Sequence, residues 1–322
     1  MAKVNDDNNA PIMVVVVCRT YNKSKHVRSS LSGVVSQKTN FRYIAVVYDD
    51  ASTDGTAEIV KEFAKKYPDI IVPVLRQENL WSKKDGSWER ANASYLPGKY
   101  LCFCDDDDYW TDEYKLQKQV DFLEAHPDYG MVYTQVRILN EETQEFSKGW
   151  SSQTNFEELL IGANPILNFT ACMRTSLYLD YFKFVGMRNK WETEDLPVWF
   201  FISHSCKIMF LEDITGVYRI LPDSWSHHPD VMKQVAFSQS VFECRCFFAK
   251  EYGYEDKLPV IARREVDNLF RLSAQKDKSV SRFVYRFAKD YHVLSLAVLA
   301  KCFLYSTSIG RRYHRRKYPA SI

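Results

Sequence analysis

The stretch "YLCFCDDDDYW", residues 100–110, combines an apolar segment with four consecutive aspartates, 105–108. Residues 100–104 are apolar or small and are typical of a buried strand. Carboxylates about 5 Å apart repel each other by roughly 3 kcal/mol per pair at an effective dielectric constant near 20. The stretch therefore predicts a strand whose carboxyl end holds an excess of negative charge.

Strand-like and helix-like segments alternate on both sides of this stretch. The continuous β-branched run "IMVVVV" indicates a strand buried on both faces, as in a parallel sheet. Asp54 is the predicted N-cap of a helix that carries Val60 and Phe63 on one face. The alternation up to about residue 125 predicts an α/β sheet with right-handed crossovers. The segments are strands at 12–17, 43–48, 70–75, 100–104 and 130–139, helices at 27–37 and 195–204, one or two strands at 207–220, and helices from about residue 229 onward.

Composition bounds the class of protein. The 322 residues are 46% hydrophobic and 26% charged, a globular composition, and the net charge of +2 creates no global field for nucleic acid. The eight cysteines form no C-x-x-C pair, which argues against zinc and for free thiols in a reducing cytosol. No apolar run typical of a signal peptide or of a membrane span is present. We therefore expect a cytoplasmic protein.

Polar clusters follow three of the predicted strands, at residues 18–22, 49–55 and 105–108. Ligands bind at the carboxyl ends of strands in open α/β sheets, so we expect these clusters to meet there. Asp49 and Asp50 also suit an ordinary solvated turn. For the four aspartates the alternatives are an exposed acidic loop and a site for Mg²⁺ or Mn²⁺, and their apolar flanks favour the metal.

The order of these segments resembles the inverting family 2 glycosyltransferases, which have the GT-A fold: a Rossmann-like, mostly parallel α/β sheet flanked by helices. The resemblance implies a nucleotide-diphospho-sugar donor, a UDP-sugar first of all, and a divalent cation, Mn²⁺ or Mg²⁺. The resembling segments are "VVVVCRTYNKSKHVRSSLSGVVSQKTNFRYIAVVYDDASTDGT" (14–56), "GKYLCFCDDDDYWTDEYKLQKQ" (98–119), "WETEDLPVWF" (191–200) and "YRILPDSWSH" (218–227).

The resemblance assigns donor-binding roles to residues at the three strand ends. By position, Asp50 matches the aspartate that binds the nucleotide base, with Asp49 beside it, and Thr20 and Tyr21 match the loop against the nucleoside. The metal-binding D-x-D motif maps onto the acidic cluster, with Asp107 as the favoured metal ligand. The cluster members concerned are Asp105, Asp106 and Asp107, and Asp108 leaves the register open by one residue.

The last two resembling segments supply the remaining site residues. Asp195 of the pair Glu194–Asp195 matches the catalytic base, which takes the proton of the acceptor hydroxyl as it attacks the sugar. Both acids also suit a helix N-terminus, where the macrodipole favours them. Arg219 or His227 would meet the diphosphate, and His227 is also a candidate metal ligand. Whether Lys83, Lys84 or Arg90 contacts the donor, or whether all three lie in a solvated basic loop, stays open.

We expect a nucleotide-sugar domain at residues 1–228 and a helical extension at 229–322. The apolar segment 291–306, followed by "RRYHRRK", suits a helix in the membrane interface, peripheral on the inner face of the plasma membrane. It equally suits a helix packed on the protein before a solvated tail. A lipid-linked acceptor would give the membrane interpretation a purpose.

The resemblance indicates a hexosyl- or N-acetylhexosaminyl-transferase that acts on a glycan or lipid-linked glycan in cell-surface polysaccharide synthesis. Two alternatives stand beside it. A sugar nucleotidyltransferase would want a glycine-rich phosphate loop near the N-terminus, and "CRTYNKSKH" has no glycine. A non-catalytic module that binds a divalent ion or carbohydrate would need the acidic loop but no base on a separate element.

Overall fold

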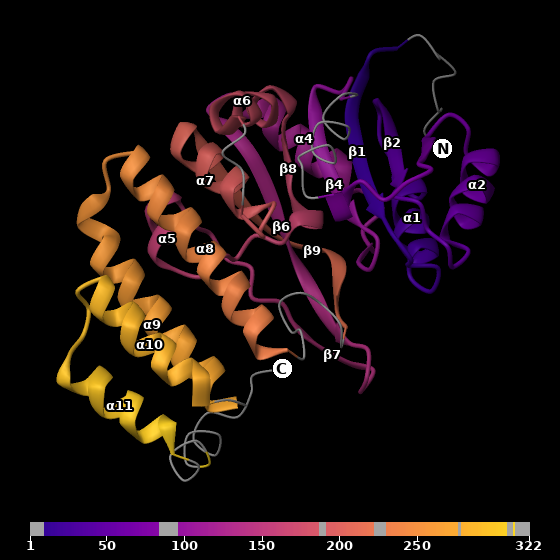
Figure 1. The fold of residues 1–322 in the computed structure, drawn as a ribbon. Helices are drawn as coiled ribbons and strands as arrows, with labels where there is room; N and C mark the ends of the chain where they lie inside the picture. The colour runs from indigo at the N-terminus through magenta and orange to yellow at the C-terminus, as the bar shows by residue number, and fades with distance from the viewer. Residues whose placement is uncertain are drawn as a thin grey trace. The chain divides into compact units, whose positions relative to one another are not determined.

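The computed structural model describes residues 10–83, 96–186, 191–221, 230–275, 278–307 and Arg312 (Figure 1). The chain divides into two compact units. The sheet unit consists of residues 1–155, 164–189 and 201–220, and the helical unit consists of residues 156–163, 190–200 and 221–322. The predicted domain boundary at residue 228 stays a prediction, since residues 222–229 lie outside the described part.

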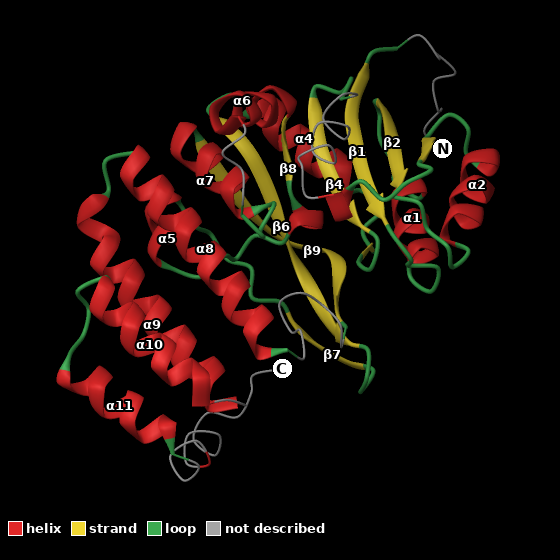
Figure 2. Cartoon of the chain, viewed as in Figure 1, coloured by secondary structure: helices red, strands yellow, loops and turns green. Residues whose placement is uncertain are grey.

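The sheet unit is built on one mixed sheet (Figure 2). Strands β3, β2, β1 and β4 are neighbours in that order and pair in parallel, as the alternation of strands and helices predicts. The order continues with β8, β6, β9 and β5, among which antiparallel pairs appear, and β7 pairs with β6. The strands are β1 (Ile12–Thr20), β2 (Arg42–Asp49), β3 (Ile71–Leu75), β4 (Tyr100–Asp105), β5 (Tyr109–Trp110), β6 (Tyr129–Asn140), β7 (Glu145–Lys148), β8 (Cys172–Arg174) and β9 (Lys207–Ile220).

Helices cover both faces of the parallel part of this sheet. On one face, α1 (Val27–Val35), α2 (Thr56–Lys66) and α4 (Lys115–Ala125) share one hydrophobic cluster with the even-numbered side chains of β1 and β4 and the odd-numbered side chains of β2. On the other face, Tyr178 of α6 (Thr175–Val185) meets Phe103 edge to face, with ring centroids 5.6 Å apart. A strand covered on both faces must be apolar throughout, which explains the β-branched run in β1.

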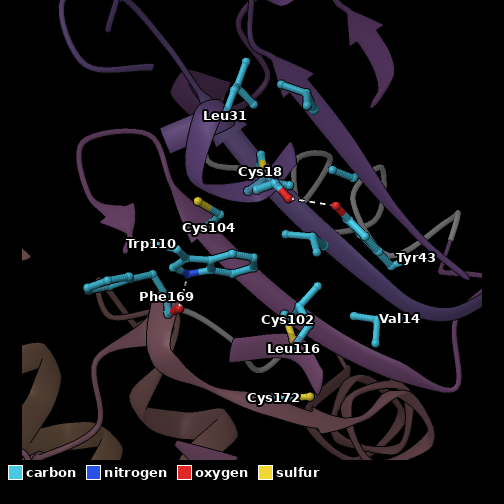
Figure 3. Packing of buried hydrophobic residues seen from close by; sticks show 14 of the residues in the cluster. Val14, Cys18, Leu31, Tyr43, Cys102, Cys104, Trp110, Leu116, Phe169 and Cys172 are labelled. Atoms are coloured by element: carbon cyan, nitrogen blue, oxygen red, sulfur yellow. Dashed lines mark hydrogen bonds between the residues drawn. The ribbon is translucent and has the colours of Figure 1, made fainter. Parts of the chain in front are cut away.

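The core on the α1 side reaches the end of the acidic stretch (Figure 3). Trp110 is 3% exposed, and its indole nitrogen donates a hydrogen bond of 2.8 Å to the backbone oxygen of Phe169. Phe169 lies in a short 3₁₀ turn, Asn168–Thr170, directly before β8. The hydrogen bond anchors the acidic stretch at its carboxyl end, one strand away from β4.

The predicted N-cap of α2 is wrong by one residue. Gly55 is the N-cap, with φ of 96°, a conformation that glycine adopts without strain. The Asp54 carboxylate instead accepts hydrogen bonds from the backbone nitrogen and the hydroxyl of Thr56, at 3.0 and 2.6 Å. These bonds lower the pKa of Asp54 to about 2, although burial alone would raise it.

The helical unit contains the helices predicted from residue 229 onward and two earlier segments. Arg245 of α8 is 7% exposed and donates to the backbone oxygens of Leu159 and Leu160, so it ties the segment 156–163 to the C-terminal helices. Within the described residues no helix has the length and apolar character needed to cross a bilayer. The helices are α5 (Phe156–Ile161), α8 (Val231–Glu251), α9 (Leu258–Gln275), α10 (Lys278–Asp290) and α11 (Leu296–Ser306), and α7 (Leu196–Ser205) contributes residues to both units.

Candidate functional site

The carboxyl ends of β1, β2 and β4 meet at one edge of the sheet. Thr20 pairs with Asp49 and Arg19 pairs with Asp105 in the parallel register, so the three polar clusters start side by side. The backbone nitrogen of Tyr21 donates to the Asp106 carboxylate at 3.2 Å. The expected meeting of the three clusters is therefore found.

The loop after β1 is fixed to the loop after β2 by hydrogen bonds in both directions. Asn22 has φ of 53°, and this left-handed conformation suits asparagine. Its backbone nitrogen donates to the Ser52 hydroxyl at 2.9 Å, and its side-chain oxygen accepts from the backbone nitrogen of Thr53 at 2.8 Å. These bonds fix the position of Tyr21, whose side chain is exposed.

Three carboxylates of the acidic loop, Asp105–Asp108, have partners on different elements. Asp105 accepts from the side-chain amide of Asn168 at 2.9 Å, and Asp107 accepts from the ammonium group of Lys23 at 2.8 Å. Asp108 accepts from the backbone nitrogen of Arg219 at 2.8 Å. The acidic loop is thus held by the loop after β1, by β9 and by the 3₁₀ turn before β8.

Crowding of like charges in this loop disfavours ionisation. Burial, with Asp107 as the next cause, raises the pKa of Asp106 to about 7, although part of that side chain stays exposed. Burial also raises the pKa of Asp108 well above its usual range, and Asp107 and Asp105 add to the effect. The loop has more carboxylates than it can keep ionised with the cations of the chain alone.

The Arg219 side chain lies against the acidic loop and is about one tenth exposed. Its guanidinium donates to the backbone oxygen of Asp107 and to the Ser29 hydroxyl, the latter at 3.0 Å, and pairs with the Glu141 carboxylate at 2.7 Å. It also stacks over the Tyr109 ring at 4.3 Å. These contacts show Arg219 as a support of the acidic loop, and its predicted contact with a diphosphate stays a prediction.

Asp50 is buried beside an arginine that the sequence analysis did not single out. Arg76, directly after β3, donates to the Asp50 carboxylate at 3.1 Å, and the backbone nitrogens of Leu80 and Trp81 donate to it at 3.0 Å each. The Arg76 guanidinium also lies over the Tyr48 ring. These donors satisfy the buried Asp50 side chain, and its two carboxylate oxygens fix the backbone at Leu80 and Trp81.

Asp49 makes the hydrogen bond of an ordinary turn, but the predicted solvation of this turn is wrong, since Asp49 is 2% exposed and Asp50 is fully buried. One carboxylate oxygen accepts from the backbone nitrogen of Ser52 at 3.1 Å. Its other oxygen is buried and has no hydrogen-bond partner among the described residues. An oxygen in this state is a candidate acceptor for a ligand group.

Asp195 and Glu194 lie at the start of α7, in the helical unit. The Asp195 carboxylate accepts from the backbone nitrogen of Leu196 at 2.8 Å and from the Thr193 hydroxyl at 2.9 Å. This contact with a helix N-terminus is the capping role that the sequence allowed. The role of catalytic base stays a prediction.

Some predicted residues contribute nothing to the described geometry. His227, Lys84 and Arg90 lie outside the described residues. Lys83 lies in the 3₁₀ turn Trp81–Lys83, and its ammonium group pairs with Glu78 at 2.8 Å.

The carboxylates of the acidic loop could bind a hard cation whose other ligands come from a bound substrate. Among the residues whose placement is described, no three Asp, Glu, His or Cys side chains form a ready metal site. Asp107 already holds one cation, the Lys23 ammonium, and both side chains are 30% exposed. Mg²⁺ and Mn²⁺ bind with one or two carboxylates and substrate phosphates, so the donor set fits a metal that arrives with a phosphorylated ligand.

Comparison with known proteins identifies the family. The model of "Glycosyl transferase family 2" matches residues 15–180, just over half of the chain. The chain belongs to glycosyl transferase family 2. The matched range contains the loops after β1 and β2 and the whole acidic loop.

Relatives agree with this assignment, and solved structures show the fold. EpsE of Bacillus subtilis, which is named as a glycosyltransferase, is 27% identical over 235 residues, 73% of this chain and 80% of EpsE. The protein Rv1520 of Mycobacterium tuberculosis is 35% identical over 149 residues, 45% of this chain, and the match spans only 42% of Rv1520. The crystal structure of Staphylococcus aureus TarS 1–349 with UDP has a TM-score of 0.53 at 16% identity and covers 97% of this chain and 94% of that one. The GT-A fold is confirmed.

Lys23, Arg76 and Asn168 of this family 2 chain were missed by the sequence analysis. Arg76 had a readable signal, because it directly follows the predicted strand 70–75 at the edge where the polar clusters meet. Lys23 lies in the segment "CRTYNKSKH" among other cations, and nothing local separates it from Lys25. Asn168 is 63 residues from its partner Asp105, and no periodicity connects the two.

Proposed function

We propose that the chain transfers a sugar from a nucleotide-diphospho-sugar, a UDP-sugar first of all, to an acceptor hydroxyl with inversion at the anomeric carbon. The observation that carries this proposal is the acidic loop at the carboxyl ends of β1, β2 and β4, with its raised carboxyl pKa values. TarS is titled as a complex with UDP and, in a second structure, with UDP-GlcNAc. Family membership supports sugar transfer over the two alternative classes.

The donor side of the reaction depends on residues at the sheet edge. The proposed base-binding residue is Asp50, which Arg76 and two backbone nitrogens hold in one position. Asp49 supports it with a buried oxygen that has no partner among the described residues, and Thr20 and Tyr21 face the nucleoside. Fixed donors and acceptors of this kind lose little freedom when the ligand binds.

Asp107 is the proposed ligand of Mn²⁺ or Mg²⁺, with Asp105 beside it. When bound, the cation supplies positive charge to the diphosphate that leaves. Asp106 and Asp108 stay in their hydrogen bonds to Tyr21 and Arg219 and keep the loop in shape. The mannosyltransferase PcManGT of Pyrobaculum calidifontis, with a TM-score of 0.51 at 16% identity and covering 98% of this chain and 90% of that one, is titled as a complex with GDP-Man and Mn²⁺.

Asp195 is the proposed catalytic base, and Glu194 is the residue that would support it or contact the acceptor. The acceptor hydroxyl is a weak nucleophile, so a carboxylate must take its proton during the attack. Inversion needs one displacement and one base. Asp195 accepts its two hydrogen bonds through one oxygen, Oδ1, and Oδ2 receives neither of them.

The proposed acceptor is a glycan or lipid-linked glycan of a cell-surface polysaccharide, and the sugar is a hexose or N-acetylhexosamine. One relative, RfbG of Shigella flexneri, is named as a dTDP-rhamnosyl transferase and is 25% identical over 188 residues, 57% of this chain and 63% of RfbG. The proposed location is the cytoplasm, because the eight cysteines are free and free thiols are typical of a reducing cytosol.

A thermal-shift screen of UDP, GDP and dTDP, each with and without Mn²⁺, tests the proposal. A ligand present at 100 times its dissociation constant stabilises the native state by about 2.7 kcal/mol, so the true nucleotide should raise the melting temperature only with metal. Stabilisation by Mn²⁺ that no nucleotide increases would indicate a divalent-ion module. Conversion of a sugar phosphate and a nucleoside triphosphate would indicate a nucleotidyltransferase.

A further inference from the structure

The last two described helices expose an unusual amount of apolar surface. Leu296 and Phe303 of α11 are 86% and 76% exposed, and Leu299 and Leu304 are 38% and 41% exposed. With the exposed Ala300 they occupy positions i, i+3, i+4, i+7 and i+8, which lie on one face of a helix. We call these five residues the α11 stripe.

The opposite face of α11 packs on the helical unit. Tyr305 is 5% exposed and meets Phe270 of α9 edge to face, with ring centroids 5.5 Å apart. The Lys301 ammonium group reaches Asp267 of α9 at 3.3 Å. The helix is therefore apolar on both faces, and its own protein covers only one of them.

A second exposed stripe, on the neighbouring helix α10, is cationic. Arg282, Arg286 and Lys289 are exposed at i, i+4 and i+7, and Tyr285 lies between them, 41% exposed. The inner face of α10, which includes Val284 and Phe287, is buried. A cationic stripe beside an apolar one is the pattern of helices that lie in the plane of an anionic bilayer surface.

The distribution of charge along the whole chain points to the same partner. Residues 258–322 contain 14 Lys and Arg against 4 Asp and Glu, a net charge of +10. The remaining 29 Lys and Arg and 37 Asp and Glu, from totals of 43 and 41, give residues 1–257 a net charge of −8. The overall value of +2 hides this asymmetry. A second copy of the same cationic segment would be repelled, whereas anionic lipid head groups attract it.

We propose that α10 and α11 bind the surface of an anionic bilayer, with the α11 stripe among the acyl chains and the α10 cations at the head groups. An 11-residue helix is far shorter than the ~20 residues that span a bilayer, so α11 lies in the interface. The proposal is independent of the donor site. The proposal combines the interfacial helix and the packed helix that the sequence of residues 291–306 allows. One face of α11 packs on the protein, and the other face would contact lipid.

Flotation of the full chain with vesicles tests this surface. We expect binding to vesicles of equal parts phosphatidylcholine and phosphatidylglycerol, and weaker binding to phosphatidylcholine alone. Leu296→Ser with Phe303→Ser should lower the partition coefficient at least about tenfold, since both side chains leave the acyl region. Ile214→Ser is the matched control, because Ile214 is 49% exposed in the sheet unit. It should partition like the parent.

A second variant separates the charge from the apolar contribution. Arg282→Gln with Arg286→Gln should weaken binding to the anionic vesicles by about fivefold for each cation and leave binding to phosphatidylcholine unchanged. Lys65→Gln with Lys66→Gln on α2 should have no effect. Binding of the parent should also weaken steeply between about 0.1 M and about 1 M NaCl, where the Debye length falls from about 10 to about 3 Å.

Three outcomes would overturn the proposal. The parent could fail to float with any vesicle, or it could bind both compositions equally. Light scattering could show a dimer that the Leu296→Ser, Phe303→Ser variant converts to a monomer, and a second copy would then cover the α11 stripe. All three measurements are made without nucleotide, so none depends on the proposed transferase activity.

Discussion

Both units bury charged side chains, but they satisfy them in different ways. In the helical unit, Glu265 is 7% exposed and accepts from the Ser238 hydroxyl at 2.7 Å and from the Gln239 amide at 2.9 Å. Arg245 donates to two backbone oxygens. The hydrogen-bond partners of both side chains are neutral groups of the helical unit, and Glu265 and Arg245 also act on each other as opposite charges.

In the sheet unit, four carboxylates follow one another at the edge where three strands end. The Lys23 ammonium group donates to the Asp107 carboxylate, and Arg219 donates to the Asp108 carboxylate through its backbone nitrogen and to the Asp107 backbone oxygen through its guanidinium. The pKa values of Asp106 and Asp108 are raised. Both units bury charged side chains. Only the sheet unit has an excess of negative charge, and it lies beside a partly exposed edge of the sheet. The excess, more than the burial, marks this edge as a candidate site.

The largest effect is expected for Asp107→Ala, which removes the proposed metal ligand from the crowded loop. Metal-dependent nucleotide binding should weaken by at least about 100-fold, beyond the 10–100-fold typical of an outer-shell partner. The fold should persist because one source of like-charge repulsion disappears. Calorimetry with UDP and Mn²⁺ measures the change. The matched control is Asp213→Ala, an exposed acid paired with Lys118. Parental affinity in the Asp107 variant would remove this residue from the metal site.

The second largest effect is expected for Asp195→Asn in the helical unit, which should lower turnover. A general base typically contributes 10²–10⁴-fold, so turnover should fall by about that factor while donor affinity stays the same. The amide oxygen of asparagine can accept the same bonds from Leu196 and Thr193, so the start of α7 should be preserved. Near-parental turnover would exclude Asp195, and Glu194→Gln would then be the variant to examine.

The strands and the acidic loop were predictable because their signals are local. A β-branched run predicts a buried strand, and the four aspartates after "YLCFC" predict a local excess of negative charge. The parallel pairing of these strands follows from their alternation with helices, whereas their order, β3, β2, β1, β4, was not predicted. The polar clusters meet because the carboxyl ends of parallel strands share an edge.

The supports of the loop were not predictable, because they depend on contacts distant in sequence. The backbone nitrogen of Arg219 donates to Asp108, 111 residues away. That contact exists because β9 pairs in parallel with β6 and antiparallel with β5, which continues the acidic stretch. The assignment of residues 156–163 to the helical unit depends likewise on Arg245, which lies more than 80 residues later. Periodicity contains no information on which distant side chain fills such a position.

Arg76→Met tests whether the buried pair of the sheet unit depends on its partner. The side chains of Arg76 and Asp50 are 9% and 1% exposed, so the variant leaves a buried carboxylate with only its backbone donors. Loss of one partner of a buried pair costs about 3–5 kcal/mol, and the two remaining donors place this case at the lower end. Urea unfolding measures the change. Arg28→Met is the control, since Arg28 and Glu62 are 51% and 54% exposed and such pairs contribute at most about 1 kcal/mol. Equal losses of stability in the two variants would contradict the difference between a buried and an exposed ion pair.

The smallest and most selective effect is expected for Glu265→Gln in the helical unit. Burial raises the pKa of Glu265 from 4.5 to about 7, and its hydrogen bonds only partly oppose the shift. Between these two values the unfolded chain has released the proton and the folded chain still holds it. Stability of the parent therefore falls as the pH rises from about 4.5 to about 7, and the loss stays constant above that. Glutamine has no proton to release, and its amide oxygen can accept the same bonds from Ser238 and Gln239.

The Glu265→Gln variant should therefore match the parent at pH 4.5 and exceed it at pH 8. The difference is at most about 3–4 kcal/mol, from a rise of about 2.5 pKa units at roughly 1.4 kcal/mol per unit. Melting temperatures across this range measure it, with the exposed Glu243→Gln on α8 as the control that should show no such divergence. A variant that is less stable than the parent at pH 8 would mean that the hydrogen bonds of Glu265 stabilise its ionised form by more than burial destabilises it. Buried carboxylates would then be held by hydrogen-bond donors in both units. The difference between the two units would depend only on the excess of negative charge in the acidic loop.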